Sequence, residues 1–357
     1  MPANDPGDPV SQEVIDHLWE TQMKDLVFGG YSPQDNPVYV SLGGQMGAGK
    51  TGASRAIKQW HPQGEHLVPV ETDFFRQFHP KYDEYVNSPD PRKLIDATQK
   101  FAQAMVLRCH WHARGSDHGK PCRLGEPKYS LLVENTMHSP GGLTVSAAKT
   151  FAQAGYKVEA IAMAVPENLS LLGTVHRFLL PKEDKPGRST PAQDHDYGFD
   201  NMPRTIDAGE NCEFISRVTV VNRNGDTKLY DRELHTDDSV NSQQSGAKET
   251  LLTERQRPLT AGEAKQWLSD YNEVRMAYAR KDPTTRANLA PVLEPTLTRL
   301  DKATIAIAAR TLTQAPTMPQ PVHTATHINQ QNDVVHGLPA SRPVTPTQSS
   351  AGRGQAR

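Results

Sequence analysis

The sequence predicts an α/β protein, in which a mostly parallel sheet of the P-loop kinase type is flanked by helices and followed by an α-helical extension. Short apolar runs alternate with stretches of helical periodicity, the pattern of strands buried on both faces of a parallel sheet. The first run is followed at once by a glycine-rich loop and a helical pattern. Only 36% of the 357 residues are hydrophobic, which predicts one packed domain and further segments that bury little.

Six apolar runs are expected to form strands. The last two flank Asn224, Gly225 and Asp226, a hairpin signal, so these two strands are predicted to pair with each other as an antiparallel addition at the sheet edge. A helix over 12–28 is predicted to precede the first strand, because its apolar residues recur every three or four positions. The predicted strands cover 38–42, 66–70, 130–135, 157–165, 217–222 and 227–231. Further helices are predicted from residue 50, after 70, over 145–154 and up to 177.

Composition divides the chain into five parts. Residues 1–11, rich in Pro, Asp and Gly, are predicted to be disordered, and 12–235 to form the α/β domain. A polar linker is expected over 236–256. A helical extension is expected over 257–313, starting at a capping box formed by Thr260 and Glu263. Residues 314–357, dominated by Pro, Thr, Gln and Ser, cannot offset their chain entropy by burial and are predicted to be a disordered tail.

Charge, apolar runs and cysteine usage exclude several classes of protein. The 39 Lys and Arg against 41 Asp and Glu give a net charge of −2, which argues against nucleic-acid or membrane partners. No apolar run reaches the ~18 residues of a membrane span, and the first residues lack the order of a signal peptide. The three cysteines show no CxxC spacing, which predicts a reducing compartment and no structural zinc. We therefore predict a cytoplasmic protein.

A phosphate-binding loop is the strongest motif. The sequence GGQMGAGKT contains G-x-x-x-x-G-K-[ST], with a predicted strand before it and a helix after it. The backbone N–H groups of such a loop surround phosphates, Lys50 would reach the β and γ oxygens, and Thr51 would ligate Mg²⁺. A loop that only makes a turn is the alternative. The predicted ATP- or GTP-binding residues are Gly44, Gln45, Met46, Gly47, Ala48, Gly49, Lys50 and Thr51.

Two carboxylates follow the second predicted strand. Ligands gather at the carboxyl ends of strands in an open α/β sheet, so Glu71 and Asp73 should lie near the γ-phosphate. A kinase with a hydroxyl acceptor needs one carboxylate to accept the hydroxyl proton. The spacing equally allows Asp73 to cap a helix starting at Phe74. The loop by itself also suits motors, GTPases and transporter ATPases, although the chain length favours a small-molecule kinase.

Several blocks in order resemble the zeta toxin family over roughly residues 38–231. They are GGQMGAGKT, TDFFRQFHPKYDEY, LLVENT and AGYKVEAIAMAVPENLSLLGTVHRF. The family comprises bacterial P-loop kinases that phosphorylate UDP-activated amino sugars, typically UDP-N-acetylglucosamine. The resemblance implies ATP as the phosphate donor with Mg²⁺, and a small antitoxin as a partner.

The resemblance assigns the catalytic roles residue by residue. Asp73 matches the family's catalytic acid in a D-x-F-[KR]-x-x-H-P block, which favours the base over the helix cap. Arg76 and His79 match the rest of that block, and His79 is alternatively a residue that only orders the loop. Arg177 and Arg188 match the family arginines that contact the ATP phosphates, where guanidinium groups stabilise transferring charge.

On the acceptor side the resemblance is less complete. Glu134 and Thr136 match the residues that hold the sugar, and Ser146 matches another substrate hydroxyl. The family usually reads E-G-T-x-R after the third strand, but here His138 stands where the arginine would be. Histidine is a weaker, pH-dependent cation without a planar fork. The family also offers an acidic residue on the preceding helix, where Gln103 stands.

Three functions therefore remain open. The first is a sugar-nucleotide kinase acting as a toxin. The second is a related kinase for another nucleotide such as NAD, which the His138 departure favours. The third is a nucleotide-binding module without catalysis. A metal site is disfavoured, because the spacing of Cys109, His110, His112, His118 and Cys122 matches no zinc pattern.

Overall fold

The structure is a computed structural model that describes residues 9–116, 126, 128–139, 143–181, 187–234 and 246–313. The tail predicted to be disordered, 314–357, and the first eight residues lie outside the described residues. Residues 9–11 are described, and the Ser11 side chain accepts a hydrogen bond from the Val14 backbone N–H at 3.4 Å, so it caps the first helix. No helix of the described ranges has the length and apolar character needed to cross a membrane.

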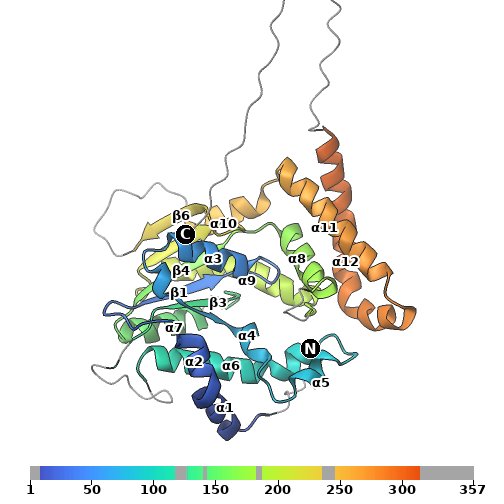
Figure 1. Ribbon diagram of the computed structural model, residues 1–357. Helices are drawn as coiled ribbons and strands as arrows, with labels where there is room; N and C mark the ends of the chain where they lie inside the picture. The colour runs from blue at the N-terminus through green and yellow to red at the C-terminus, as the bar shows by residue number, and fades with distance from the viewer. Residues whose placement is uncertain are drawn as a thin grey trace, which may run out of the picture. The chain divides into compact units, whose positions relative to one another are not determined.

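A six-stranded sheet forms the centre of the domain, in the order β2-β3-β1-β4-β5-β6 (Figure 1). The first five strands are parallel, and β6 is antiparallel to β5 at the edge, as predicted from the hairpin turn. The strands are β1 Val38–Gly43, β2 Val68–Glu71, β3 Leu131–Asn135, β4 Lys157–Met163, β5 Arg217–Val221 and β6 Lys228–Glu233. The predicted fold class is confirmed.

Side chains of alternate residues along the central strands β1, β3 and β4 enter different cores. Val38, Val40 and Leu42 of β1 enter one core, whereas the Tyr39 ring enters the other and stacks on Phe151 with 4.0 Å between ring centroids. The helices of the Tyr39 core are α1 Gln12–Leu18, α2 Lys24–Phe28, α4 Thr72–Arg76, α6 Lys93–Ala113, α7 Leu143–Gln153, α9 Ala192–Glu210 and α10 Ala247–Gln256. A π-helical turn, Trp19–Met23, joins α1 to α2.

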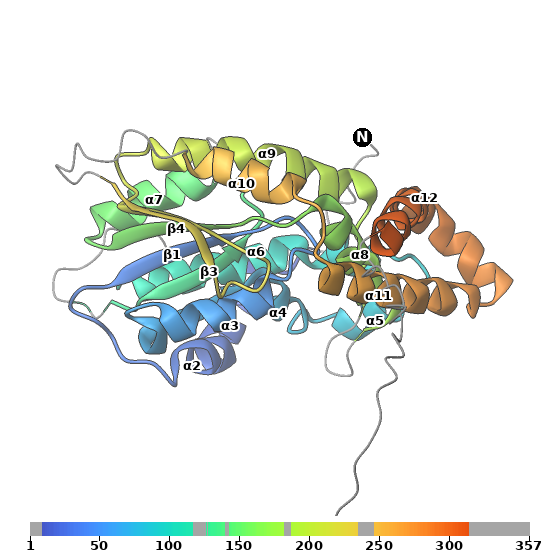
Figure 2. The same cartoon turned by 90° about the horizontal axis from the view of Figure 1, so that it is seen from above.

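The other core joins the sheet to the C-terminal helices. It contains residues of α3 Lys50–Trp60, α8 Glu167–Leu179, α11 Ala261–Ala279 and α12 Pro283–Thr313. The capping box predicted at Thr260 and Glu263 is present at the start of α11, and Trp267 Nε1 donates to the Asn168 carbonyl at 3.0 Å. The helical extension therefore packs on α8 (Figure 2).

Two helices differ from the prediction. Residues 247–256 belong to the predicted linker, but they form α10, which packs beside α9 (Figure 2). Its apolar contribution is confined to Ala247 and Leu251, so the polar outer face dominated the sequence pattern. Helix α9 was not predicted, because Gly198, Pro203 and Gly209 interrupt it. Burial against the sheet compensates for these poor helix formers.

The sheet topology positions the carboxyl ends of three strands together. Glu71 of β2 pairs with Glu134 of β3, and Glu134 also pairs with Leu42 of β1. Since β1 lies between β3 and β4, the sheet has its topological switch point here, where ligands of open α/β sheets bind. Short helices α4 Thr72–Arg76 and α5 Tyr82–Val86 follow β2, and a 3-10 turn, Gly64–His66, precedes it.

Candidate active site

The phosphate-binding loop is closely packed between β1 and α8. Gly47 and Gly49 have φ angles of +75° and +97°, which glycine adopts without steric cost. A Cβ atom on Gly47 would lie 2.0 Å from the Ser170 carbonyl oxygen of α8. The Gly44 N–H donates to the Asn135 carbonyl at 3.2 Å. The positive φ and the short contact with α8 require glycine at position 47 for close packing.

Lys50 reaches back across the loop. Its Nζ donates to the carbonyl oxygens of Gly44 and Gln45, at 2.8 and 3.4 Å. Burial lowers the pKa of Lys50 to about 8; the nearby charge of Glu134 opposes this shift, while Arg177 and Arg188 add to it. The structure thus brings Lys50, Glu134 and both predicted arginines close enough to interact electrostatically.

Asp73 lies within the first turn of α4. The helix begins at Thr72 and Glu71 occupies the N-cap position without a side-chain capping bond, so the helix-cap interpretation of Asp73 is wrong. The Asp73 carboxylate instead accepts from Arg76 Nε at 3.0 Å and forms an ion pair with Arg188. The charge of Arg188 also contributes to lowering the pKa of Lys50.

Arg76 holds Asp73 in place, a role that the sequence did not reveal. Its guanidinium donates to the Ile95 carbonyl at 3.0 Å, to Thr98 Oγ1 at 2.9 Å and to Gln99 Oε1 at 2.5 Å, all on α6. Burial lowers its pKa to about 10, so it remains charged near neutral pH. The arginine thereby fixes α4 and its carboxylate against α6. The signal was the D-x-x-R spacing, which places both side chains on one helix face.

Arg177 has a buried N–H group, at Nε, for which the described residues provide no acceptor. Its Nη2 donates to Thr190 Oγ1 at 3.1 Å, but the buried Nε has no hydrogen-bond partner in the part of the chain that the structure describes. Burial lowers the pKa of both Arg177 and Arg188 to about 10. A buried N–H without a partner costs about 1–3 kcal/mol, so an anion bound here would relieve that cost. The arrangement suits a phosphate oxygen.

The loop after β3 has an unusual backbone. Met137 adopts φ of 46°, a left-handed conformation that is uncommon outside glycine. Asn135, which occupies the glycine position of the family motif, organises the turn: its Nδ2 donates to Ser41 Oγ at 2.6 Å and its Oδ1 accepts from the Met137 N–H at 2.8 Å. Such strain recurs at ligand-binding sites.

His138 faces the other predicted acceptor residues. Its Nδ1 contacts the Thr136 hydroxyl, and its ring lies 5.5 Å from that of Tyr197, which is 59% exposed on α9. Burial lowers the pKa of His138, so the ring is mostly neutral at pH 7. The side chain therefore offers a hydrogen bond and a flat surface instead of the charge that an arginine would supply.

Three other predicted residues make few contacts with the rest of the site. Ser146 is exposed on α7, and among the described residues no contact joins its side chain to the rest of the site. Thr51 is half-buried in the first turn of α3. His79 Nδ1 accepts from the Lys81 N–H at 3.2 Å, which orders the loop after α4 as the alternative interpretation proposed.

The histidines and cysteines weighed as a metal site pack mostly as apolar groups. Cys109 is buried in α6, and the His110 ring lies 5.2 Å from that of Phe151. His118 and Cys122 lie outside the described residues. Within the described ranges no group of three His, Cys, Asp or Glu side chains is arranged to bind a metal ion.

Comparison with known proteins identifies the family. The zeta toxin sequence profile, described as "Zeta toxin", matches residues 24–235, more than half of the chain. The chain belongs to the zeta toxin family. The members are kinases that use ATP, and the matched segment contains the phosphate-binding loop, Asp73 and both arginines. Helix α10 follows the end of that segment.

Known toxins are similar to this zeta toxin family member over most of its length. It is 28% identical over 254 residues to Toxin zeta of Enterococcus hirae, covering 69% of this chain and 80% of the relative. It is 29% identical over 226 residues to Toxin PezT of Streptococcus pneumoniae, covering 62% and 81%. A solved structure from the PezAT chromosomal toxin-antitoxin system of that bacterium matches with a TM-score of 0.58 and 23% identity, covering 75% of this chain and 98% of that chain. The structural match supports the shared fold.

Proposed function

We propose that the protein is an ATP-dependent kinase of the zeta toxin type, which transfers the γ-phosphate to a hydroxyl of UDP-N-acetylglucosamine or a closely related UDP-activated amino sugar. The observation that carries this proposal is the position of Asp73. Arg76 and Arg188 hold its carboxylate, and Arg188 is close enough to Lys50 to lower its pKa. An acid beside the phosphate-binding loop is what hydroxyl phosphorylation requires.

In the proposed reaction Asp73 accepts the proton of the acceptor hydroxyl. The hydroxyl oxygen forms a bond to the γ-phosphorus while the bond to the β–γ bridging oxygen breaks, and ADP leaves. Lys50, Arg188 and the unpartnered Nε of Arg177 bind the phosphate oxygens and stabilise the charge of the transition state. Glu134 and Thr136 position the acceptor sugar, with His138 and Ser146 contributing further contacts.

The residues present fit a Mg²⁺ ion bound together with ATP. Mg²⁺ commonly takes one or two protein oxygens and completes its octahedral shell with phosphate and water oxygens. The Thr51 hydroxyl, half-buried in the first turn of α3, can supply such an oxygen. When bound, Mg²⁺ neutralises charge on the β- and γ-phosphates.

The activity is tested by incubating the protein with ATP, Mg²⁺ and UDP-N-acetylglucosamine. Mass spectrometry should detect a product heavier by one phosphate with wild type, and little product with Asp73→Ala. Asp83→Ala, which removes an exposed acid on α5, is the matched control and should retain activity. Absence of product with wild type, despite ATP binding, would reject the proposed acceptor.

NAD is the second acceptor to test, because His138 replaces the family arginine. The His138 ring and the exposed Tyr197 ring lie near each other and could hold a planar base. The same mass-spectrometric assay with NAD in place of the UDP sugar separates these two acceptors. A protein that binds ATP but phosphorylates neither compound would instead support a nucleotide-binding module.

The biological role follows from the same chemistry. We propose that the protein acts in the cytoplasm as the toxin of a toxin–antitoxin pair, since phosphorylating a UDP sugar would deplete a precursor of growth. The matched solved structure comes from such a pair in S. pneumoniae. Induction of wild type in bacteria should stop growth, whereas Asp73→Ala and co-expression with a cognate small antitoxin should allow it. Equal growth with soluble wild type and Asp73→Ala would reject toxicity.

A further inference from the structure

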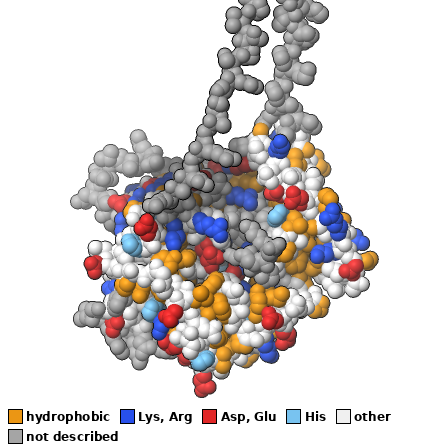
Figure 3. All heavy atoms as spheres, in the orientation of Figure 1, with side chains coloured by type: hydrophobic (Ala, Val, Ile, Leu, Met, Phe, Trp, Pro, Cys, Tyr) orange, Lys and Arg blue, Asp and Glu red, His pale blue; other side chains and the backbone are white. Residues whose placement is uncertain are grey.

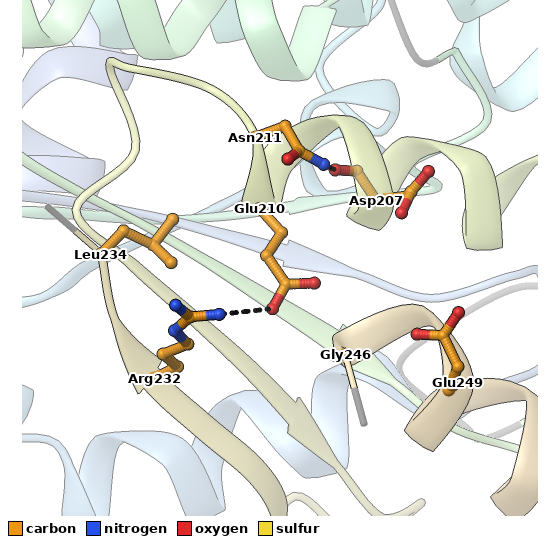
Figure 4. A pocket seen from close by; sticks show the side chains of 7 residues that line it. All are labelled: Asp207, Glu210, Asn211, Arg232, Leu234, Gly246 and Glu249. Carbon is orange, nitrogen blue, oxygen red and sulfur yellow. Dashed lines mark hydrogen bonds and ion pairs between the residues drawn. The ribbon is translucent and has the colours of Figure 1, made fainter. Parts of the chain in front are cut away.

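Helix α10 is anchored beside the end of α9. The Ala247 N–H donates to Glu210 Oε2 at 3.0 Å, and Ala247 and Leu251 are buried in the core. Figure 4 shows the Glu210 side chain pointing between Arg232 of β6 and the start of α10 at Gly246. The helix is therefore fixed at its N-terminal end, and its direction determines where its last turn lies.

The last turn of α10 places Arg255 inside the protein. Only 7% of this residue is exposed. Its Nη1 donates to the Phe199 carbonyl at 2.7 Å, and its guanidinium lies 4.1 Å from the centroid of the Phe199 ring. Its Nη2 donates to Gln45 Oε1 at 3.0 Å and also contacts Met202 Sδ. No ion pair within the described ranges includes Arg255; burial lowers its pKa to about 10, and the charge of Asp200 only partly opposes this shift.

Gln45, the partner of Arg255, is the second residue of the phosphate-binding motif and is fully buried. Its Nε2 donates to the Val165 carbonyl at 3.0 Å and to Ser170 Oγ at 3.2 Å. Its backbone carbonyl accepts from the Ala48 N–H at 3.1 Å and from Lys50 Nζ at 3.4 Å. The side chain of Gln45 thus sets the position of a carbonyl that both closes the loop and orients the lysine.

We propose that Arg255 is a positioning residue for the phosphate-binding loop. By holding Gln45, it keeps the loop and Lys50 in the conformation that binds the phosphates of a nucleotide. Helix α10, which lies beyond the segment matched by the family profile, is then a structural part of the nucleotide site. This inference rests on the proposed binding of ATP but not on the identity of the acceptor.

Nucleotide affinity of Arg255→Met, measured by calorimetry with ATP and Mg²⁺, tests the proposal. We expect the Kd to rise about tenfold. Arg108→Met is the matched control: Arg108 is equally buried, on α6, and bonds Asp16 and the Ala104 carbonyl instead of the loop. At temperatures where both variants are folded, Arg108→Met should keep the wild-type Kd. Hydrogen exchange of loop amides such as that of Ala48 should accelerate in Arg255→Met only.

A double-mutant cycle tests whether Arg255 affects nucleotide binding through Gln45. In a Gln45→Leu background, Arg255→Met should change the Kd less than twofold, because the contact is already lost. A wild-type Kd and wild-type loop exchange in folded Arg255→Met would overturn the inference while leaving ATP binding intact. Absence of ATP binding by wild type would instead reject the proposed function and the inference with it. If Arg255→Met does not fold, Arg255→Lys, which keeps the charge but not the fork, replaces it under the same criteria.

Discussion

The proposed ATP side and the proposed acceptor side of the site are built differently. On the ATP side, the loop packs between β1 and α8, and the Gln45 side chain hydrogen-bonds with three separate partners, Val165, Ser170 and Arg255. On the acceptor side, exposed and half-buried side chains dominate. There the structure shows a left-handed Met137 and the Thr136–His138 contact.

The positions of the proposed phosphate-binding groups are determined by the fold, whereas those of the proposed acceptor groups are determined by a few side chains. The positions of phosphate-binding groups depend on packing throughout the domain, so they change only with large losses of stability. The proposed acceptor groups Glu134, Thr136 and His138 lie at or just after the end of β3, which is where the chain departs from the family motif. Among members of the family, the use of ATP as phosphate donor should therefore vary less than the choice of acceptor.

The largest effect is expected at Asp73, which the proposed reaction places between the ATP and the acceptor hydroxyl. Asp73→Asn should lower kcat about 10²- to 10⁴-fold, because the amide cannot accept the hydroxyl proton. The Kd for ATP should change little. Steady-state kinetics with calorimetry checks this split, and a loss confined to ATP affinity would place Asp73 on the ATP side instead.

The next largest effect concerns the buried donor on the ATP side. Arg177→Met should lower kcat about 10²- to 10³-fold, since a preorganised cation on the phosphoryl group is removed. Arg217→Met, which breaks an ion pair with Asp231 on β5 and β6, serves as the control and should be nearly neutral. An equal effect of both substitutions on kcat would indicate a general structural loss.

A pH effect of up to tenfold per pH unit is predicted from Lys50. In the free protein burial lowers its pKa to about 8, whereas bound phosphates favour the charged form. Below pH 8 the lysine is already protonated, so affinity for ATP should be nearly constant. Above pH 8 binding must take up a proton, and the Kd should rise. Calorimetry in buffers of different ionisation enthalpy measures this uptake, and Lys50→Met should abolish it.

The smallest effect is expected on the acceptor side. His138→Arg restores the charge of the family motif and should change the KM for the phosphorylated acceptor about two- to tenfold, while the KM for ATP stays constant. A lower KM would indicate that a phosphate group of the acceptor lies near this position, because an arginine fork favours phosphate oxygens. A change in the KM for ATP would show that the two sides are not independent.

The sequence predicted the strands well because their apolar runs are continuous and bounded by turn residues. The glycine-rich loop between β1 and α3 was also predictable, since its motif consists of contiguous residues. By contrast, α9 contains helix-breaking residues, and α10 has only two buried apolar residues with Arg255, so neither pattern indicated a buried helix. Both helices are stabilised by tertiary packing that local propensity does not describe.

The same contrast applies to the site as a whole. The chain sequence by itself determined the α/β class, the glycine loop with Lys50, and the presence of an acid after the second strand, because each depends on neighbouring residues. Only the tertiary structure decided that Asp73 is no helix cap, that Arg76 and Arg188 hold it, and that Arg255 contacts Gln45 across 210 positions. Such contacts form between segments far apart in the sequence, and their geometry exists only once the sheet and helices have packed.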